Sequence, residues 1–240
     1  MSETDTIRRG SFRQEIRQVI TGVAAPYHEP PAVVRRRRIV VAGFLIIGAV
    51  VLGFSLNAPP GTASFYWLTL LLAVVWFTGA FLGRPIHLGR IRWRGRNQRP
   101  VITGTAIGLL LGGVFVVGGL IARDIGPIAH LIRQVLEYEH RGNLWLVVII
   151  TLINGAAEEC FFRGAAYSAL RRHYPVLIST VLYVAVTAAS GNPMLSFAAI
   201  ILGTVCALER RATGGVLAPL LTHLVWSLVI VLGLPPIFGL

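Results

Sequence analysis

The sequence has no lysine, few acidic residues and little charge for its length. Its 22 basic residues are all arginine and stand against 10 acids, so the formal net charge is +12. Charged residues make up 13% of the chain, whereas a soluble globular domain carries about 25%. This scarcity of charge argues against a soluble enzyme, and the large hydrophobic fraction excludes a disordered chain.

Cysteine is also scarce, and the two that are present indicate no disulfide framework. Cys160 and Cys206 both lie in apolar runs, unlike the spaced cysteines of small secreted domains. Hydrophobic residues make up 55% of the chain, and its mean hydropathy is +0.70. A basic nucleic-acid-binding protein needs its charge on a surface that faces water. Most of this chain cannot face water, so we expect an integral membrane protein with no nucleic-acid partner.

Long apolar stretches are what the sequence has in abundance. A hydrocarbon core of about 30 Å needs about 20 apolar residues in a helix. Seven stretches approach this length, namely 39–56, 64–82, 101–122, 144–170, 176–189, 195–208 and 216–234. Helices satisfy their own backbone groups within lipid. The sequence therefore predicts an all-α polytopic membrane protein with about seven transmembrane helices in a domain covering 39–240.

The first 38 residues form a separate basic segment in this prediction. Apolar residues between Phe12 and Val23 recur at helical spacing beside Arg13 and Arg17, before the arginine run 35–38. This pattern is typical of an amphipathic helix that lies on a membrane surface and contacts anionic lipid. We therefore expect residues 1–38 to be a cytosolic basic segment with anionic lipid at the cytosolic face as a partner.

The distribution of arginine predicts an orientation. Residues 1–38, 83–100, 163–173 and 209–215 hold 19 of the 22 arginines, and Arg163 is the one among them that belongs to a span. Arg123, Arg133 and Arg141 fall on the opposite side. Positively charged loops stay in the cytosol. We therefore expect a cytosolic N-terminus and an external C-terminus, in a bacterial plasma membrane.

Three of the predicted spans contain polar residues that lipid disfavours. An ionisable group at the bilayer centre costs at least about 2.5–3.5 kcal/mol. The fourth span contains four polar or ionisable side chains, and the fifth and seventh contain two each. In chain order they are Asn154, Glu158, Glu159, Arg163, Tyr183, Thr187, His223 and Ser227. Counted from the nearest cytosolic charges, the three groups lie at one depth of about 20 Å. We therefore expect them to share one polar cavity.

Helical spacing assigns different roles to the two glutamates. Glu159 and Arg163 are separated by four residues and can pair. Glu158 points about 100° away from Glu159 around the helix, where it lacks a cation of its own and suits a general base acting on water. His223, at the same depth, suits a donor to a developing oxyanion. The alternative is a buried Glu–Arg pair that only fixes helix packing, which leaves Glu158 unexplained.

These residues resemble the motifs of a known family. The run Glu158–Gly164 is similar to the EExxxR motif of the CAAX protease and bacteriocin-processing (CPBP) family of intramembrane proteases, and Gly214–Ser227 is similar to its C-terminal HxxxN-type motif. The resemblance covers residues 100–234. It implies an all-helical endopeptidase that hydrolyses a peptide bond of a membrane-associated or lipidated protein or peptide. Glu158 would activate water, Glu159 and Arg163 would support it, and His223 would stabilise the oxyanion.

The sequence departs from this family in its middle motif. The expected FxxxH falls on Tyr183–Thr187, where threonine replaces histidine, and Ser227 stands where asparagine is common. The resemblance allows a divalent metal such as zinc, for which Glu158 and His223 would be the ligands. A catalytic zinc site uses three protein ligands and a water, so Thr187 speaks against a tight metal site. Asn154, Tyr183, Thr187 and Ser227 are expected to support the site.

Two other functions remain open. Thr187 favours a catalytically degraded relative, such as a membrane scaffold or an immunity protein. A buried carboxylate with a histidine also describes the proton relay of a proton-coupled transporter. Transporters of that kind usually have repeated halves and broken helices, and no such symmetry is evident in the sequence.

Overall fold

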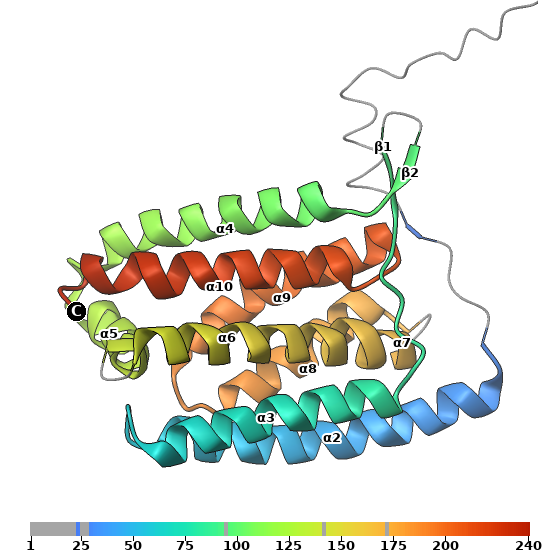
Figure 1. The fold of residues 1–240 in the computed structure, drawn as a ribbon, viewed down its shortest axis with the longest axis horizontal. Helices are drawn as coiled ribbons and strands as arrows, with labels where there is room; N and C mark the ends of the chain where they lie inside the picture. The colour runs from blue at the N-terminus through green and yellow to red at the C-terminus, as the bar shows by residue number, and fades with distance from the viewer. Residues whose placement is uncertain (1–22, 25–28, 94–95, 141–142, 171–172) are drawn as a thin grey trace, which may run out of the picture.

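The computed structural model describes residues 23–24, 29–93, 96–140, 143–170 and 173–240. The predicted amphipathic helix of the N-terminal segment falls on residues outside this part of the chain. The described part contains a helical bundle and one short β-hairpin (Figure 1).

Six helical segments are long and apolar enough to cross a membrane. They are α2 (Pro31–Asn57), α3 (Ala63–Leu82), α4 (Val101–Ala122), Leu144–Leu170, α9 (Pro193–Thr213) and α10 (Leu217–Ile237). The fourth is continuous through α6 (Leu144–Glu159), the π-helix η1 (Cys160–Ala166) and α7 (Tyr167–Leu170). A shorter apolar helix, α8 (Pro175–Ala188), corresponds to the fifth predicted span. The all-α polytopic membrane fold is therefore confirmed.

Several boundaries differ from the prediction. Helix α2 begins at Pro31, because proline is tolerated in the first turn, where its missing N–H has no helical partner, so the arginine run 35–38 lies within the helix. Helix α9 continues to Thr213 instead of ending at residue 208. The hairpin of β1 (Ile91–Trp93) and β2 (Arg96–Gln98), and the helix α5 (Gly126–His140), are additional elements between the spans.

The helices run in one general direction and pack as neighbouring pairs. Helix α10 lies along α4, α8 along α9 and α2 along α3, while α6 lies between α3 and α10 (Figure 1). Two backbone hydrogen bonds connect the segment after α3 to the start of α10. Val216 N–H donates to His87 O, and Leu217 N–H donates to Leu88 O. This arrangement puts α6 and η1 at the centre of the bundle.

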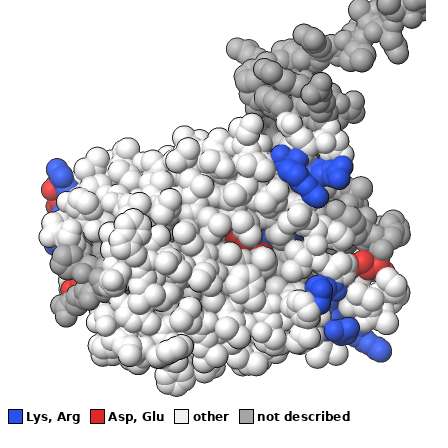
Figure 2. Space-filling view, in the orientation of Figure 1, with Lys and Arg blue, Asp and Glu red and all other residues white. Residues whose placement is uncertain are grey.

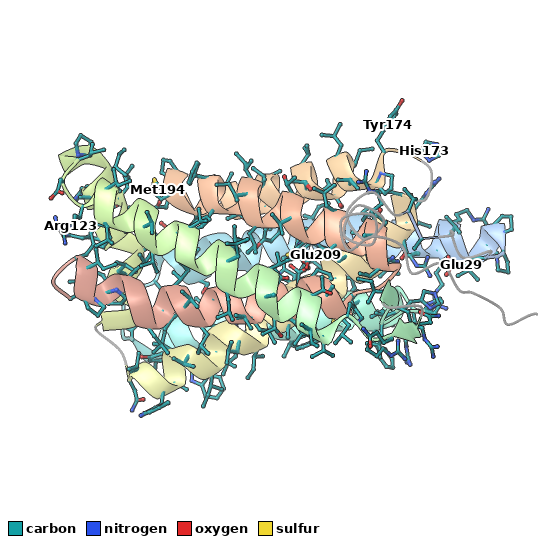
Figure 3. The ribbon with its side chains drawn as sticks, turned by 90° about the horizontal axis from the view of Figure 1, so that it is seen from above. Glu29, Arg123, His173, Tyr174, Met194 and Glu209 are labelled. Atoms are coloured by element: carbon teal, nitrogen blue, oxygen red, sulfur yellow. The ribbon has the colours of Figure 1, made fainter. Side chains whose placement is uncertain are left out.

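Most of the charge on the surface lies at the two ends of the bundle. Figure 2 shows arginine and acidic side chains at the ends and an almost uncharged face between them. Viewed from above, Arg123 lies at one end, and Glu29, His173 and Tyr174 lie at the other (Figure 3). Such an uncharged belt is what a hydrocarbon environment requires. The chain is therefore an integral membrane protein.

Aromatic packing positions the central helix. The Trp76 ring lies 4.7 Å from that of Phe161 and 5.2 Å from that of Phe162, measured between centroids. All three are almost fully buried. Gly48 on α2 makes room for this cluster, because a Cβ atom at that position would overlap the six-membered ring of Trp76. Small residues allow helices in membranes to approach in this way.

We predict that Gly48→Ala destabilises the protein. The added methyl must displace Trp76 from Phe161 and Phe162, and overpacking of this kind costs about 1–3 kcal/mol. Thermal unfolding in detergent micelles should show a midpoint lower by about 3 °C or more. Gly43→Ala is the matched control, because a Cβ atom there meets nothing within 4 Å. An equal effect of both substitutions would contradict the packing argument.

Candidate active site

The central helix changes its geometry where its polar residues occur. Glu158 and Glu159 end the α-helical part, and Arg163 lies in the π-helical turn that follows. π-Helical turns are rare and frequent at functional sites. Gly155 lies one turn before Glu159, and a Cβ atom there would be 3.3 Å from Cδ2 of His223. The glycine therefore lets His223 on α10 approach α6 closely.

A buried ion pair connects the central helix to two others. Glu159 Oε1 lies 2.9 Å from Arg163 NH1 and 2.9 Å from His223 Nδ1. Glu159 and Arg163 both have 0% exposure. Arg163 NH2 also donates to the carbonyl of Gly203 on α9, at 3.0 Å. Charges buried this deeply must be paired, so this cluster fixes α6, α9 and α10 relative to one another.

Glu158 lies beside this ion pair and has a different partner. The Tyr183 hydroxyl on α8 donates to Glu158 Oε2 at 2.9 Å. Glu158 is half-buried, whereas Glu159 is fully buried. Figure 2 shows a hollow in the uncharged face with acidic atoms at its floor. A carboxylate held by a phenol and still partly accessible can contact a water molecule.

The other predicted site residues contribute less directly. Thr187 donates its hydroxyl to the carbonyl of Tyr183 on its own helix. Asn154 donates to the carbonyl of Ile150, and its Oδ1 is buried without a partner among the described residues. Ser227 is buried one turn beyond His223. The structure thus brings two hydrogen-bonded groups together, Tyr183 with Glu158 and Glu159 with both Arg163 and His223, while the Thr187 hydroxyl donates to its own helix.

A third buried carboxylate was missed by the sequence analysis. The predicted cytosolic segment 209–215 includes Glu209, but this residue lies within α9 and is 7% exposed. Its Oε1 lies 2.8 Å from the hydroxyl of Thr222, the residue before His223. Gly214 is the sequence feature that could have indicated a longer helix α9, because it forms the C-cap with a φ of 73°. Glycine is common at this position.

The donor set does not fit a three-ligand zinc site. No group of three His, Cys, Asp or Glu side chains suited to a metal ion occurs in the part of the chain that the structure describes. Oε1 of Glu159 already accepts from Arg163 and His223, and the Thr187 hydroxyl is engaged with its own helix. A divalent metal therefore has too few ligands here, by the usual requirement of catalytic zinc.

Comparison with known proteins identifies this region. Residues 140–229 match the family described as Rce1-like, type II CAAX prenyl endopeptidase Rce1-like. No curated protein and no solved structure is significantly similar to the chain. The matched residues include the whole cluster from Glu158 to His223 and lie inside the region in which the sequence resembles the CPBP family. Residues 140–229 are therefore similar to the Rce1-like family, and this match is consistent with the resemblance of the sequence to the CPBP intramembrane proteases.

Proposed function

We propose that this protein is an intramembrane endopeptidase that hydrolyses a peptide bond of a membrane-associated or lipidated protein or peptide. One observation carries the proposal: the half-buried Glu158 lies next to a fully buried Glu159–Arg163 pair that holds His223. The Rce1-like description, which names a prenyl endopeptidase, supports a lipidated substrate. A carboxylate for water and an imidazole for the oxyanion are the two groups that such a hydrolysis needs.

In this mechanism Glu158 acts as the general base. Its carboxylate takes a proton from a water molecule as the water oxygen attacks the carbonyl carbon of the scissile bond. The proton then passes to the leaving nitrogen as the C–N bond breaks, which restores the Glu158 carboxylate. Tyr183 orients this carboxylate through its hydrogen bond to Oε2. Positioned proton transfer of this kind typically contributes about 10²–10⁴-fold in rate.

His223 is the group that stabilises the oxyanion in this mechanism. Its Nδ1–H donates to Glu159 Oε1, and its Nε2–H is then the donor for the negatively charged oxygen. The Glu159 carboxylate orients the imidazole, while Arg163 holds that carboxylate in place. An acid that orients a histidine in this way is a recurrent arrangement in hydrolases.

A catalytically degraded scaffold or immunity protein is the second candidate. The observation that favours it is the hydroxyl of Thr187, which donates to the backbone of its own helix where the family motif has a histidine. In this case the buried ion pair would serve only to hold three helices together.

The proposed orientation has the arginine-rich end of the bundle in the cytosol, in a bacterial plasma membrane. Arg35–Arg38 lie near the start of α2, Arg210 and Arg211 lie in the last turn of α9, and Arg84 and Arg90 follow α3 at that end. Positive loops are retained in the cytosol.

We predict that alkaline phosphatase fused after Leu240 is active in intact bacterial cells, because it is exported, and that the same fusion after Gly89 is inactive. The enzyme activity of the two fusions measures the orientation. An inactive fusion after Leu240 together with an active fusion after Gly89 would contradict it.

We predict that Glu158→Gln lowers hydrolysis of a farnesylated CAAX-type reporter peptide by at least about 10²-fold, because the amide cannot accept a proton. Tyr183→Phe should cause a smaller loss, since it removes only the orienting hydrogen bond. Peptide cleavage by the protein reconstituted in vesicles is the measurement. Glu137→Gln on α5 is a control for the same chemical change away from the cluster. Full activity of a folded Glu158→Gln variant would refute the catalytic assignment.

We predict that Thr187→Val retains activity within about twofold, because the lost hydrogen bond lies within one helix and not with Glu158 or His223. The same cleavage assay measures this. If the parent is inactive and Thr187→His creates cleavage, the degraded-scaffold interpretation is correct and the peptidase proposal fails.

A further inference from the structure

A large cavity at the arginine-rich end of the bundle is separate from the candidate active site. Its volume is about 1290 Å³, and its walls come from the start of α2, the start of α8 and the end of α9. Thr180 and Thr204 are among its lining residues, but Glu158 and His223 are not among the described ones. The Gly203 carbonyl, which accepts from Thr180 and Arg163, stands between the cavity and the ion pair. The cavity is therefore lined by other residues than the candidate active site.

The charge of this cavity is strongly positive. Four arginines line it, namely Arg35, Arg38, Arg210 and Arg211. The acid among the described lining residues is Glu29, whose two carboxylate oxygens bind Arg37 at 2.6 and 2.9 Å. Burial, followed by the nearby charge of Arg210, lowers the pKa of His87, so this histidine adds no positive charge near neutral pH. The guanidinium groups thus exceed the available negative charge.

One of these arginines has a buried donor without an acceptor. Nε of Arg211 is buried and has no hydrogen-bond partner among the described residues. A buried donor of this kind is costly unless something accepts from it. Because this Nε is itself not exposed to the cavity, an anionic group there would contact the outer guanidinium nitrogens of the lining arginines. Guanidinium groups bind phosphate oxygens especially well, because several N–H groups lie in one plane.

The remainder of the lining is apolar. Val34, Val176 and Leu177 form parts of the wall, and Tyr167 lies under the guanidinium of Arg210, 4.9 Å from ring centroid to Cζ. The arginines occur where α2 begins and α9 ends, at the level at which lipid headgroups meet a bilayer. Basic pockets between transmembrane helices at this level bind the headgroups of anionic lipids. The cavity therefore has a positively charged surface for an anionic headgroup and an apolar surface for a hydrocarbon chain.

We propose that this cavity binds one anionic glycerophospholipid, with its phosphate held by Arg35, Arg38 and Arg211 and an acyl chain along Val34 and Val176. Arg210, which also lines the cavity, is engaged elsewhere, because it donates from Nε to the carbonyl of Arg163 at 2.8 Å.

Binding of a short-chain fluorescent phosphatidylglycerol to the full chain in neutral detergent tests the proposal. We expect saturable binding of one molecule per chain, weakened at least about tenfold in Arg35→Gln/Arg211→Gln, because two charge-assisted contacts are lost. The matched control is Arg36→Gln/Arg90→Gln, which removes the same charge from the same end of the bundle at exposed residues outside the described lining. It should bind within about twofold of the parent.

Several outcomes would overturn the proposal. Equal weakening in both double variants would mean diffuse attraction to the arginine-rich end. Equal binding of the phosphatidylcholine analogue would mean that charge is irrelevant. Displacement of the probe by equimolar inorganic phosphate or an acidic peptide would assign the cavity to a free anion or a protein segment. If the first double variant does not fold, Val176→Trp, which fills the wall without changing charge, must abolish binding.

Discussion

The ion pair between Glu159 and Arg163 is the constraint on which the arrangement of the bundle depends. Both side chains are completely buried in a protein that crosses a membrane, where an unpaired charge is very costly. Their remaining hydrogen bonds reach His223 on α10 and Gly203 on α9. Pairing these two charges therefore fixes three helices, and the neighbouring Glu158 is placed as a consequence.

Much of this arrangement follows from elementary patterns in the sequence. The length of the apolar stretches is enough to predict seven helices, and a separation of four residues is enough to predict the contact between Glu159 and Arg163. Counting residues from the flanking arginines also places Glu159 and His223 at one depth. These inferences succeed because each depends on the regular geometry of a helix and on the thickness of a bilayer.

The contacts that sequence reasoning missed depend on tertiary structure. Glu209 falls in the segment 209–215 that was predicted to be cytosolic, yet it is buried in α9 and bonded to Thr222 on α10. The bond from Tyr183 to Glu158 depends on how α8 packs against η1. Nothing in the sequence alone distinguishes the hydroxyl of Tyr183, which reaches the carboxylate, from that of Thr187, which bonds to its own helix.

The central claim is that the Glu159–Arg163 pair serves catalysis by holding His223. A double-mutant cycle on hydrolysis of a farnesylated reporter peptide, with Glu159→Gln, His223→Asn and their combination, tests it most directly. If Glu159 acts through His223, the combined variant should be no slower than His223→Asn by more than about twofold, although each single change causes a large loss. Losses that multiply in the combined variant would show that the two residues act independently, and would contradict the account.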